Sequence, residues 1–260
     1  MEEAGIEYEV MDGVAKITLN RPARRNALSV AGCNRLFELW DEVDTDPRVK
    51  TVILTAAPCG TFCAGMDLKE AADIKQAQGV DVLTLIRDPF HQRMRSVTKP
   101  IIAAMTGHFS AGGMMLSLNS DIRIGLANTR GGITEAKVGR GSPWAVPLLW
   151  MMPQPMLMEM VLTGETVEID RLQAVGFVNY VEADVDAVIA RAEKLATTIR
   201  DNAPLSVMAA KKSMMTAVSL GCDAGVAEAA SIHRSVYESD DAQEGMLAFK
   251  EGRKPRWSGR

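Results

Sequence analysis

Two stretches of small residues, each placed between an apolar run and a helical pattern, are where this sequence could support chemistry. Residues 106–117 follow the apolar run 100–105, and residues 59–70 follow the β-branched run 51–56. A junction of strand, short turn and helix leaves backbone N–H groups without intrahelical partners at the start of the helix. Such N–H groups, together with the helix dipole, suit a developing negative charge. We therefore expect the backbone of these stretches to supply part of any chemistry.

Few side chains near these stretches could move protons. Glu135 is the one carboxylate in an expected loop over residues 129–141, and taken alone it is more typical of an exposed loop acid than of a catalytic group. We expect Asp67 to cap the helix that follows it rather than to react. His91 lies near the middle of a helix predicted over residues 80–97, and we expect it to be a packing or surface residue.

The composition limits the kinds of protein that the chain can be. It has 260 residues, 47% hydrophobic and 24% charged, which fits one large domain, alone or with a small appendage. A net charge of −4 argues against a nucleic-acid-binding surface. No apolar run approaches the ~20 residues that span a bilayer, and no signal-like segment opens the chain. We expect a cytoplasmic location, or an organelle after processing.

Cysteine and histidine are too scattered to predict a metal site. The four cysteines and three histidines lie far apart or lack ligand spacing: Cys33, Cys59, Cys63, Cys222, His91, His108 and His233. We expect free thiols in a reducing compartment, with no metal and no redox cofactor. No phosphate-binding or dinucleotide motif is present, because the 111–113 segment lacks the required glycine spacing.

Hydrophobic periodicity predicts strands that alternate with helices for about 200 residues, followed by helices alone. Apolar alternation on both sides of Asp12-Gly13 predicts a hairpin, and Ser29 is a suitable N-cap. The predicted strands are 6–10, 14–19, 51–56, 101–105, 121–127 and 179–181. Further predicted helices are 29–44, 114–119, 155–163, 169–175, 185–201, 204–220, 222–237 and 239–250. This layout indicates an α/β fold with a helical appendage.

Two segments have more than one interpretation. Residues 142–152 are apolar and contain Trp144 and Trp150, so they either line an apolar ligand site or pack in the core. The basic tail, residues 251–260, is either a solvated surface segment or a phosphate contact.

Ordered motifs along nearly the whole chain resemble the crotonase superfamily, that is, the enoyl-CoA hydratase/isomerase family. They are Leu19-Asn20-Arg21-Pro22, Asn26-Ala27-Leu28-Ser29, Phe62-Cys63-Ala64-Gly65-Met66-Asp67-Leu68, Lys99-Pro100-Ile101-Ile102-Ala103-Ala104, Gly107 with Ala111-Gly112-Gly113 and Asp121, Met158-Glu159-Met160-Val161-Leu162-Thr163-Gly164, and Glu244-Gly245-Met246-Leu247-Ala248-Phe249.

This resemblance implies a spiral of ββα units over residues 1–200, which carries an oxyanion site, and a C-terminal helical region over 201–260 used in trimer contacts. It also implies a homotrimer or a hexamer of two trimers. The substrate class is acyl-CoA thioesters, with coenzyme A entering only as part of the substrate.

By the same resemblance, the backbone N–H groups of Met66 and Gly112 hold the thioester oxygen and Glu135 handles protons. The Ala64 carbonyl would accept from the adenine. Family hydratases carry two glutamates, but the position of the first is Met115 here. Candidate cations for the coenzyme A phosphates are Arg24, Arg25, Lys69, Lys250, Arg253 and Lys254, the last three supplied either by the same chain or by a neighbouring subunit.

One carboxylate is poorly suited to hydration but is sufficient to move a proton between two carbons. We therefore expect an enoyl-CoA double-bond isomerase that uses Glu135. The alternative is a hydratase assisted by another side chain, such as His108 or Ser142. A non-catalytic acyl-CoA binder is a third interpretation, and decarboxylase, thioesterase or lyase chemistry stays open.

Overall fold

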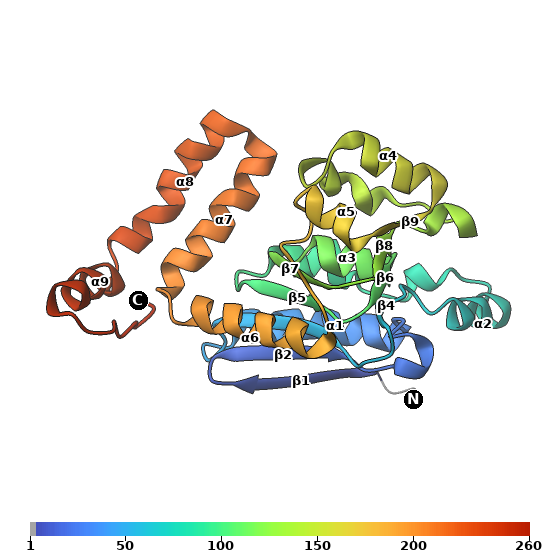
Figure 1. The fold of residues 1–260 in the computed structure, drawn as a ribbon, viewed down its shortest axis with the longest axis horizontal. Helices are drawn as coiled ribbons and strands as arrows, with labels where there is room; N and C mark the ends of the chain where they lie inside the picture. Colours follow the sequence, from blue (N-terminus) through green and yellow to red (C-terminus); the bar gives the residue numbers. More distant parts are fainter. Residues whose placement is uncertain (1–3) are drawn as a thin grey trace.

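Two β-sheets form the centre of the molecule (Figure 1). The computed structural model describes residues 4–260. The larger sheet has the strand order β1-β2-β3-β5-β7-β10, and the smaller has the order β4-β6-β8-β9. The strands are β1 (Ile6–Met11), β2 (Val14–Leu19), β3 (Thr51–Ala56), β4 (Thr61–Cys63), β5 (Ile101–Met105), β6 (His108–Ser110), β7 (Ile122–Leu126), β8 (Arg130–Gly132), β9 (Thr166–Glu168) and β10 (Tyr180–Glu182).

Helices follow the strands through most of the chain and form its C-terminal end. The α-helices are α1 (Val30–Thr45), α2 (Leu68–Gln78), α3 (Gly112–Leu118), α4 (Gln154–Thr163), α5 (Ile169–Ala174), α6 (Val185–Arg200), α7 (Pro204–Leu220), α8 (Cys222–Tyr237) and α9 (Asp240–Glu251). Shorter 3₁₀ or π turns are η1 (Pro22–Arg24), η2 (Val82–Thr84), η3 (Pro89–Arg93), η4 (Met94–Ser96), η5 (Glu135–Val138) and η6 (Pro143–Trp150). The predicted α/β class is confirmed.

The larger sheet begins with the predicted hairpin and continues with parallel strands. β1 pairs with β2 in antiparallel fashion through Asp12 and Gly13, whose φ angles of 48° and 81° suit a tight hairpin turn. β2, β3, β5, β7 and β10 then pair in parallel. Every residue of β3 and β5 is buried, as their nearly continuous apolar sequences predict.

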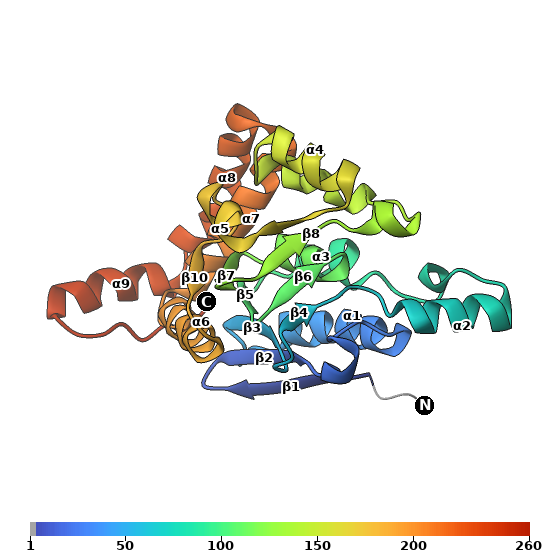
Figure 2. The ribbon, with the colours of Figure 1, turned by 45° about the vertical axis from the view of Figure 1, so that its right-hand side comes forward.

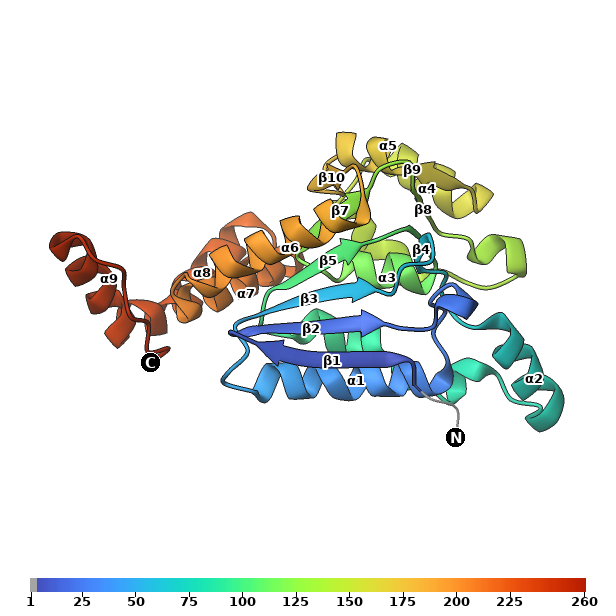
Figure 3. The ribbon, with the colours of Figure 1, turned by 60° about the horizontal axis from the view of Figure 1, so that its bottom comes forward.

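Helices cover both faces of this sheet (Figure 3). Along β3, Leu54 packs in the main core that includes Trp40 of α1, whereas Ile53 packs in a second cluster with Ala192 of α6. Successive strand side chains point to opposite faces, so this division shows that α1 and α6 lie on opposite sides.

From β3 to β8 the chain advances as a spiral in which each turn adds one strand to each sheet. β3 and β4 lead into α2, β5 and β6 lead into α3, and β7 and β8 lead into η5. In the larger sheet β3, β5 and β7 are neighbours, and in the smaller sheet β4, β6 and β8 are neighbours. This is the expected succession of ββα units, and it stacks equivalent points of successive turns.

The helix predicted over residues 80–97 is wrong. The chain there forms η2, η3 and η4, which are separate helical turns. Pro89 cannot donate a backbone hydrogen bond and forces the residue before it toward an extended conformation, and Asp88 has ψ of 104°. The carboxylate of Asp88 then accepts from the N–H groups of Phe90 and His91, so a new turn starts at this point.

The C-terminal helices project from the sheets. α7 and α8 lie side by side as a hairpin, and α9 lies at the opposite end of the molecule from α2 (Figures 1 and 2). Several apolar side chains there are exposed: Met214, Val226, Met246 and Phe249. Residues 4–260 include no helix that is long and apolar enough to cross a membrane.

Candidate active site

The spiral brings Met66, Gly112 and Glu135 together. They follow β4, β6 and β8, which are adjacent in the smaller sheet. β4 and β6 pair in parallel, and so do β6 and β8, so the carboxyl ends of all three strands meet at one edge. This edge is the usual place for ligands in parallel sheets.

The two small-residue loops are in direct contact. A Cβ added to Gly65 would lie 2.8 Å from the Cβ of Ala111 and 3.2 Å from the amide nitrogen of Gly112. A Cβ added to Gly113 would lie 2.3 Å from the carbonyl oxygen of Cys63. Glycine at positions 65 and 113 is therefore what allows the two backbones to approach.

The N–H groups of Met66 and Gly112 are both free for a ligand. Leu28 pairs with the backbone on each side of Met66, through the Gly65 carbonyl at 2.8 Å and the Asp67 N–H at 2.9 Å, and leaves the N–H of Met66 unused. Gly112 is the first residue of α3, where helix geometry offers no acceptor. Within residues 4–260 neither N–H donates to a protein acceptor.

Asp67 fixes the loop that carries Met66. Its carboxylate accepts from the N–H groups of Lys69 and Glu70 at the start of α2, which confirms the predicted cap. Its second oxygen pairs with Arg21 at 3.1 Å, and both side chains are nearly buried. The expected structural role of Asp67 is therefore the one that the contacts support.

A cavity of about 900 Å³ opens over these loops. Ala64, Met66, Gly112, Met115 and Glu135 all line it. The predicted oxyanion donors, the predicted carboxylate and the methionine at the position of the missing glutamate therefore share one cavity.

Glu135 lines this cavity, and one of its two carboxylate oxygens has no hydrogen-bond partner among the described residues. Its Oε1 accepts a hydrogen bond from the indole N–H of Trp144 at 3.1 Å, and its buried Oε2 has no partner within the described residues. Burial raises the pKa of Glu135 above its ordinary value, and backbone N–H groups and Trp144 oppose this in part. A carboxylate of this kind can both take up and return a proton.

The other carboxylates on the cavity wall are engaged elsewhere. Asp81 pairs with Arg140, with one contact at 2.8 Å, and also caps η2. Asp88 caps η3. Among the described residues, Glu135 is therefore the lining carboxylate that is left for chemistry.

The apolar segment 142–152 serves both predicted purposes. Pro143 and Trp144 of η6 line the cavity, whereas Ala145 and Leu148 are buried in the core. The hydrogen bond between Trp144 and Glu135 could not be inferred from the sequence.

The histidines differ in their positions relative to the cavity. His91, expected to be a packing or surface residue, lines it. His108 and Ser142, considered as assistants in hydration, are not among the lining residues, and the His108 ring accepts from the N–H of Arg130 at 3.0 Å. Asn119, also overlooked, donates to the His91 ring.

The predicted phosphate-binding cations divide into two groups. Arg24, Arg25 and Lys69 are exposed near the loop of Ala64, whose N–H donates to the Arg25 carbonyl at 3.2 Å. Lys250, at the end of α9, belongs to the far end of the molecule (Figure 1).

The remaining cations lie either in the C-terminal tail or on the cavity wall. Arg253 pairs with Glu244 and Glu251, and Lys254 follows it in the exposed tail. The cavity wall itself contains Lys75 and Arg140, which the sequence did not single out. No group of three or more His, Cys, Asp or Glu side chains within residues 4–260 could hold a metal ion.

Comparison with known proteins agrees with this geometry. Residues 9–260 match the family model described as enoyl-CoA hydratase/isomerase. The chain belongs to this family. It is an enzyme of the crotonase superfamily, and the predicted crotonase-like fold is confirmed.

Relatives and solved structures match over nearly the full length. The chain is 34% identical to (E)-benzylidenesuccinyl-CoA hydratase of Thauera aromatica over 98% of this chain and 99% of that one. It superposes on an enoyl-CoA hydratase structure from Mycobacterium tuberculosis with a TM-score of 0.87 and 33% identity, covering 99% and 100% of the two chains. It superposes on an enoyl-CoA hydratase structure from Bacillus anthracis with a TM-score of 0.91 and 28% identity, covering 98% of this chain and 100% of that one.

Proposed function

We propose that this family member moves the double bond of an enoyl-CoA, with Glu135 as its single proton-transferring group. The observation that carries the proposal is that the cavity contains one available carboxylate, Glu135, and has a methionine at position 115, where family hydratases have a second glutamate. Hydration needs a water held and activated while a proton reaches carbon, whereas isomerisation needs one base that returns the proton it removes.

The steps follow from the positions of the groups. The thioester oxygen accepts hydrogen bonds from the N–H groups of Met66 and Gly112. Oε2 of Glu135 removes a proton from C2 of a 3-enoyl-CoA, and the electron pair of the C–H bond moves into a dienolate whose charge rests on the thioester oxygen. Loss of one such donor typically costs about 2.7–4 kcal/mol.

Glu135, now protonated, gives the proton to C4. The electrons of the former C3–C4 double bond form the new C4–H bond, and the double bond becomes C2–C3 as the thioester carbonyl re-forms. The atoms of substrate and product balance, and Glu135 ends the cycle as a carboxylate. Its raised pKa brings the carboxyl closer to neutral pH, which favours proton transfer in both directions.

We place the coenzyme A part of the substrate at Ala64, an exposed residue on the wall of the cavity. The Ala64 N–H donates to the Arg25 carbonyl, and Arg24, Arg25 and Lys69 are exposed, so we assign these three side chains to the phosphates and the Ala64 carbonyl to the adenine. Lys250 belongs to α9 and Lys254 to the segment after it, and α9 lies at the opposite end of the molecule from α2 (Figure 1). A contact of these two cations with phosphate would therefore come from a neighbouring subunit.

A homotrimer, alone or paired into a hexamer, is part of the same proposal. The exposed apolar side chains on α7, α8 and α9 support it, since Phe249 is 90% and Val226 67% exposed in the single chain. Sedimentation velocity distinguishes three or six chains, which we expect, from a monomer.

Hydration is the second candidate, because the relatives reported above are named as hydratases. Conversion of crotonyl-CoA into 3-hydroxybutyryl-CoA without any isomerisation of 3-hexenoyl-CoA would favour it. Formation of 2-hexenoyl-CoA from 3-hexenoyl-CoA, lost in Glu135→Gln, is the result that our proposal predicts.

A further inference from the structure

One polar group on the cavity wall has no part in the proposed reaction. His91 lines the same cavity as Met115 and Glu135, and its Nε2 is buried without a partner in the described part of the chain. A buried polar nitrogen without a partner is unfavourable, and on a side chain that lines a cavity a bound ligand is a partner that can satisfy it.

The neighbouring Asn119 determines which ring nitrogen of His91 carries the hydrogen. The Asn119 amide nitrogen lies 2.9 Å from the carbonyl oxygen of Met115, which can only accept. Rotating the amide by 180° would place two oxygens against each other, so the nitrogen must occupy this position. The same nitrogen lies 3.3 Å from Nδ1 of His91 and donates to it. In the neutral ring Nδ1 therefore accepts and Nε2 carries the hydrogen.

This contact also places His91 beside the turn of α3 that contains Met115. Asn119 contacts both the His91 ring and the Met115 backbone. His91 thus lies next to the position where family hydratases would have a glutamate.

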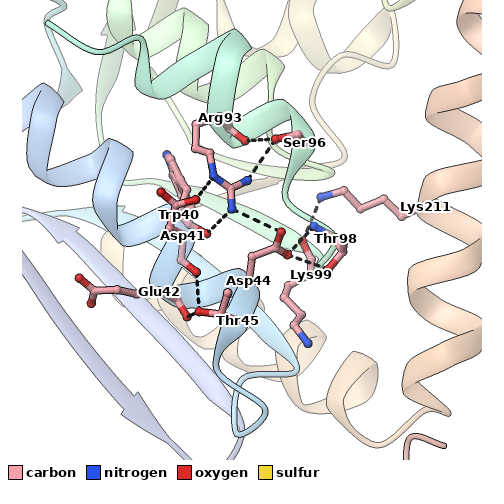
Figure 4. Close-up of polar contacts among 10 residues, drawn as sticks. All are labelled: Trp40, Asp41, Glu42, Asp44, Thr45, Arg93, Ser96, Thr98, Lys99 and Lys211. Atoms are coloured by element: carbon pink, nitrogen blue, oxygen red, sulfur yellow. Dashed lines mark hydrogen bonds and ion pairs between the residues drawn. The ribbon is translucent and has the colours of Figure 1, made fainter.

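The segment that carries His91 is firmly attached to α1. Arg93 bonds to Asp41 at 2.5 Å, to the Trp40 carbonyl at 3.2 Å and to Asp44 at 3.4 Å (Figure 4). On the other side, the Asp88 carboxylate accepts from the N–H of His91 itself. These contacts hold the backbone on both sides of His91, and the contact from Asn119 holds one nitrogen of its ring.

We propose that Nε2–H of His91 donates a hydrogen bond to an oxygen atom on the acyl group, so that the enzyme selects oxygen-bearing acyl-CoA thioesters over plain alkyl ones. In this tautomer Nε2 donates and cannot accept, so it is no base. A donor also withdraws electron density from an attacking water, which would hinder hydration, whereas a carbonyl, carboxylate or hydroxyl oxygen of the substrate satisfies it. The inference rests on the proposed acyl-CoA function but not on the isomerisation step.

Binding of saturated ligands tests this selectivity without any turnover. We would measure Kd by calorimetry for hexanoyl-CoA, its 3-oxo and 5-oxo derivatives, and hexanedioyl-CoA. We expect at least one oxygen-bearing ligand to bind wild type about tenfold more tightly than hexanoyl-CoA. The variant His91→Phe keeps an aromatic ring without the N–H, and it should bind the oxygen-bearing ligands and hexanoyl-CoA with Kd values within about twofold of one another.

Equal binding of all four ligands by wild type, or a preference that survives His91→Phe, overturns the inference. If no acyl-CoA binds, the acyl-CoA function fails and the inference fails with it. If the preference is present but isomerisation is absent, only the reaction proposed above is wrong. The three results are therefore distinguishable.

The tautomer provides a second test that does not depend on variant folding. Two-dimensional ¹H–¹⁵N NMR of the wild-type imidazoles, with His91→Gln for assignment, should show hydrogen on Nε2 of His91. Hydrogen on Nδ1 in wild type contradicts the assignment.

Discussion

Replacing Gly65 by alanine should separate the two loops that form the oxyanion site. The new Cβ would lie 2.8 Å from the Cβ of Ala111, whereas ordinary carbon contacts are about 3.5–4.0 Å. The loops must therefore move apart by about 1 Å. The Cβ would also lie 3.2 Å from the amide nitrogen of Gly112, so the shift acts on one of the two proposed donors.

A misplacement of this size can lower the rate about 10²-fold, and loss of one donor lowers kcat by about 10²–10³-fold. We expect kcat for 3-hexenoyl-CoA to fall about 10²-fold in Gly65→Ala, with a smaller change in KM, because the donors act most strongly on the charged intermediate. Formation of 2-hexenoyl-CoA, followed by its absorbance, is the assay.

Backbone strain needs a separate control, because Gly65 has φ of +98°. Gly176 also has a positive φ, +83°, but no atom lies within 4 Å of a Cβ added there. Gly176→Ala should therefore show the strain of about 1–3 kcal/mol as a lower melting temperature, with kcat retained. A kcat for Gly65→Ala within threefold of that for Gly176→Ala would refute the reasoning.

Three further predictions concern the groups around Glu135. Burial raises the pKa of Glu135 in the folded state, so the stability of the wild-type protein falls as pH rises from the pKa of the unfolded state through that of the folded state. The melting temperature of Glu135→Gln should therefore be higher than that of wild type at pH 8 and close to it at pH 4. A wild-type melting temperature at pH 8 that equals or exceeds that of the variant contradicts this prediction. Trp144→Phe removes a donor to the ionised carboxylate, so the acid limb of the kcat profile should move to higher pH, not lower. Met115→Glu should raise formation of 3-hydroxybutyryl-CoA from crotonyl-CoA at least about tenfold, since a second carboxylate can then hold the water; no increase shows that Met115 is not what limits hydration.

Elements whose sequence signals are local, such as alternation within a strand or a capping residue before a helix, were predictable. The β1–β2 hairpin, the buried strands β3 and β5, and the caps at Ser29 and Asp67 all follow from local sequence. The smaller sheet was not predicted, since its strands of three residues are too short for periodicity to appear.

The helix over residues 80–97 failed for a reason visible in the sequence. Asp88-Pro89 is a turn and capping signal, and it interrupts the apolar pattern that otherwise predicts one continuous helix. The prediction places His91 in the middle of a continuous helix, whereas in the structure His91 belongs to the new turn that Asp88 caps.

The cavity was predictable only in part. The stretches at Met66 and Gly112 were evident as junctions of small residues, and the role of Glu135 came from resemblance. The contacts of Trp144 with Glu135 and of Asn119 with His91 depend on how the spiral stacks, since the second pair is 28 residues apart. No local pattern encodes such contacts.

Proton exchange with solvent tests the central claim most directly. With 3-hexenoyl-CoA in D₂O, the wild-type protein should form 2-hexenoyl-CoA and incorporate deuterium at C2 or C4, and Glu135→Gln should lower both rates about 10²–10⁴-fold. Absence of both deuterium incorporation and 2-hexenoyl-CoA with wild type at high concentration, or undiminished rates in Glu135→Gln, would contradict the account.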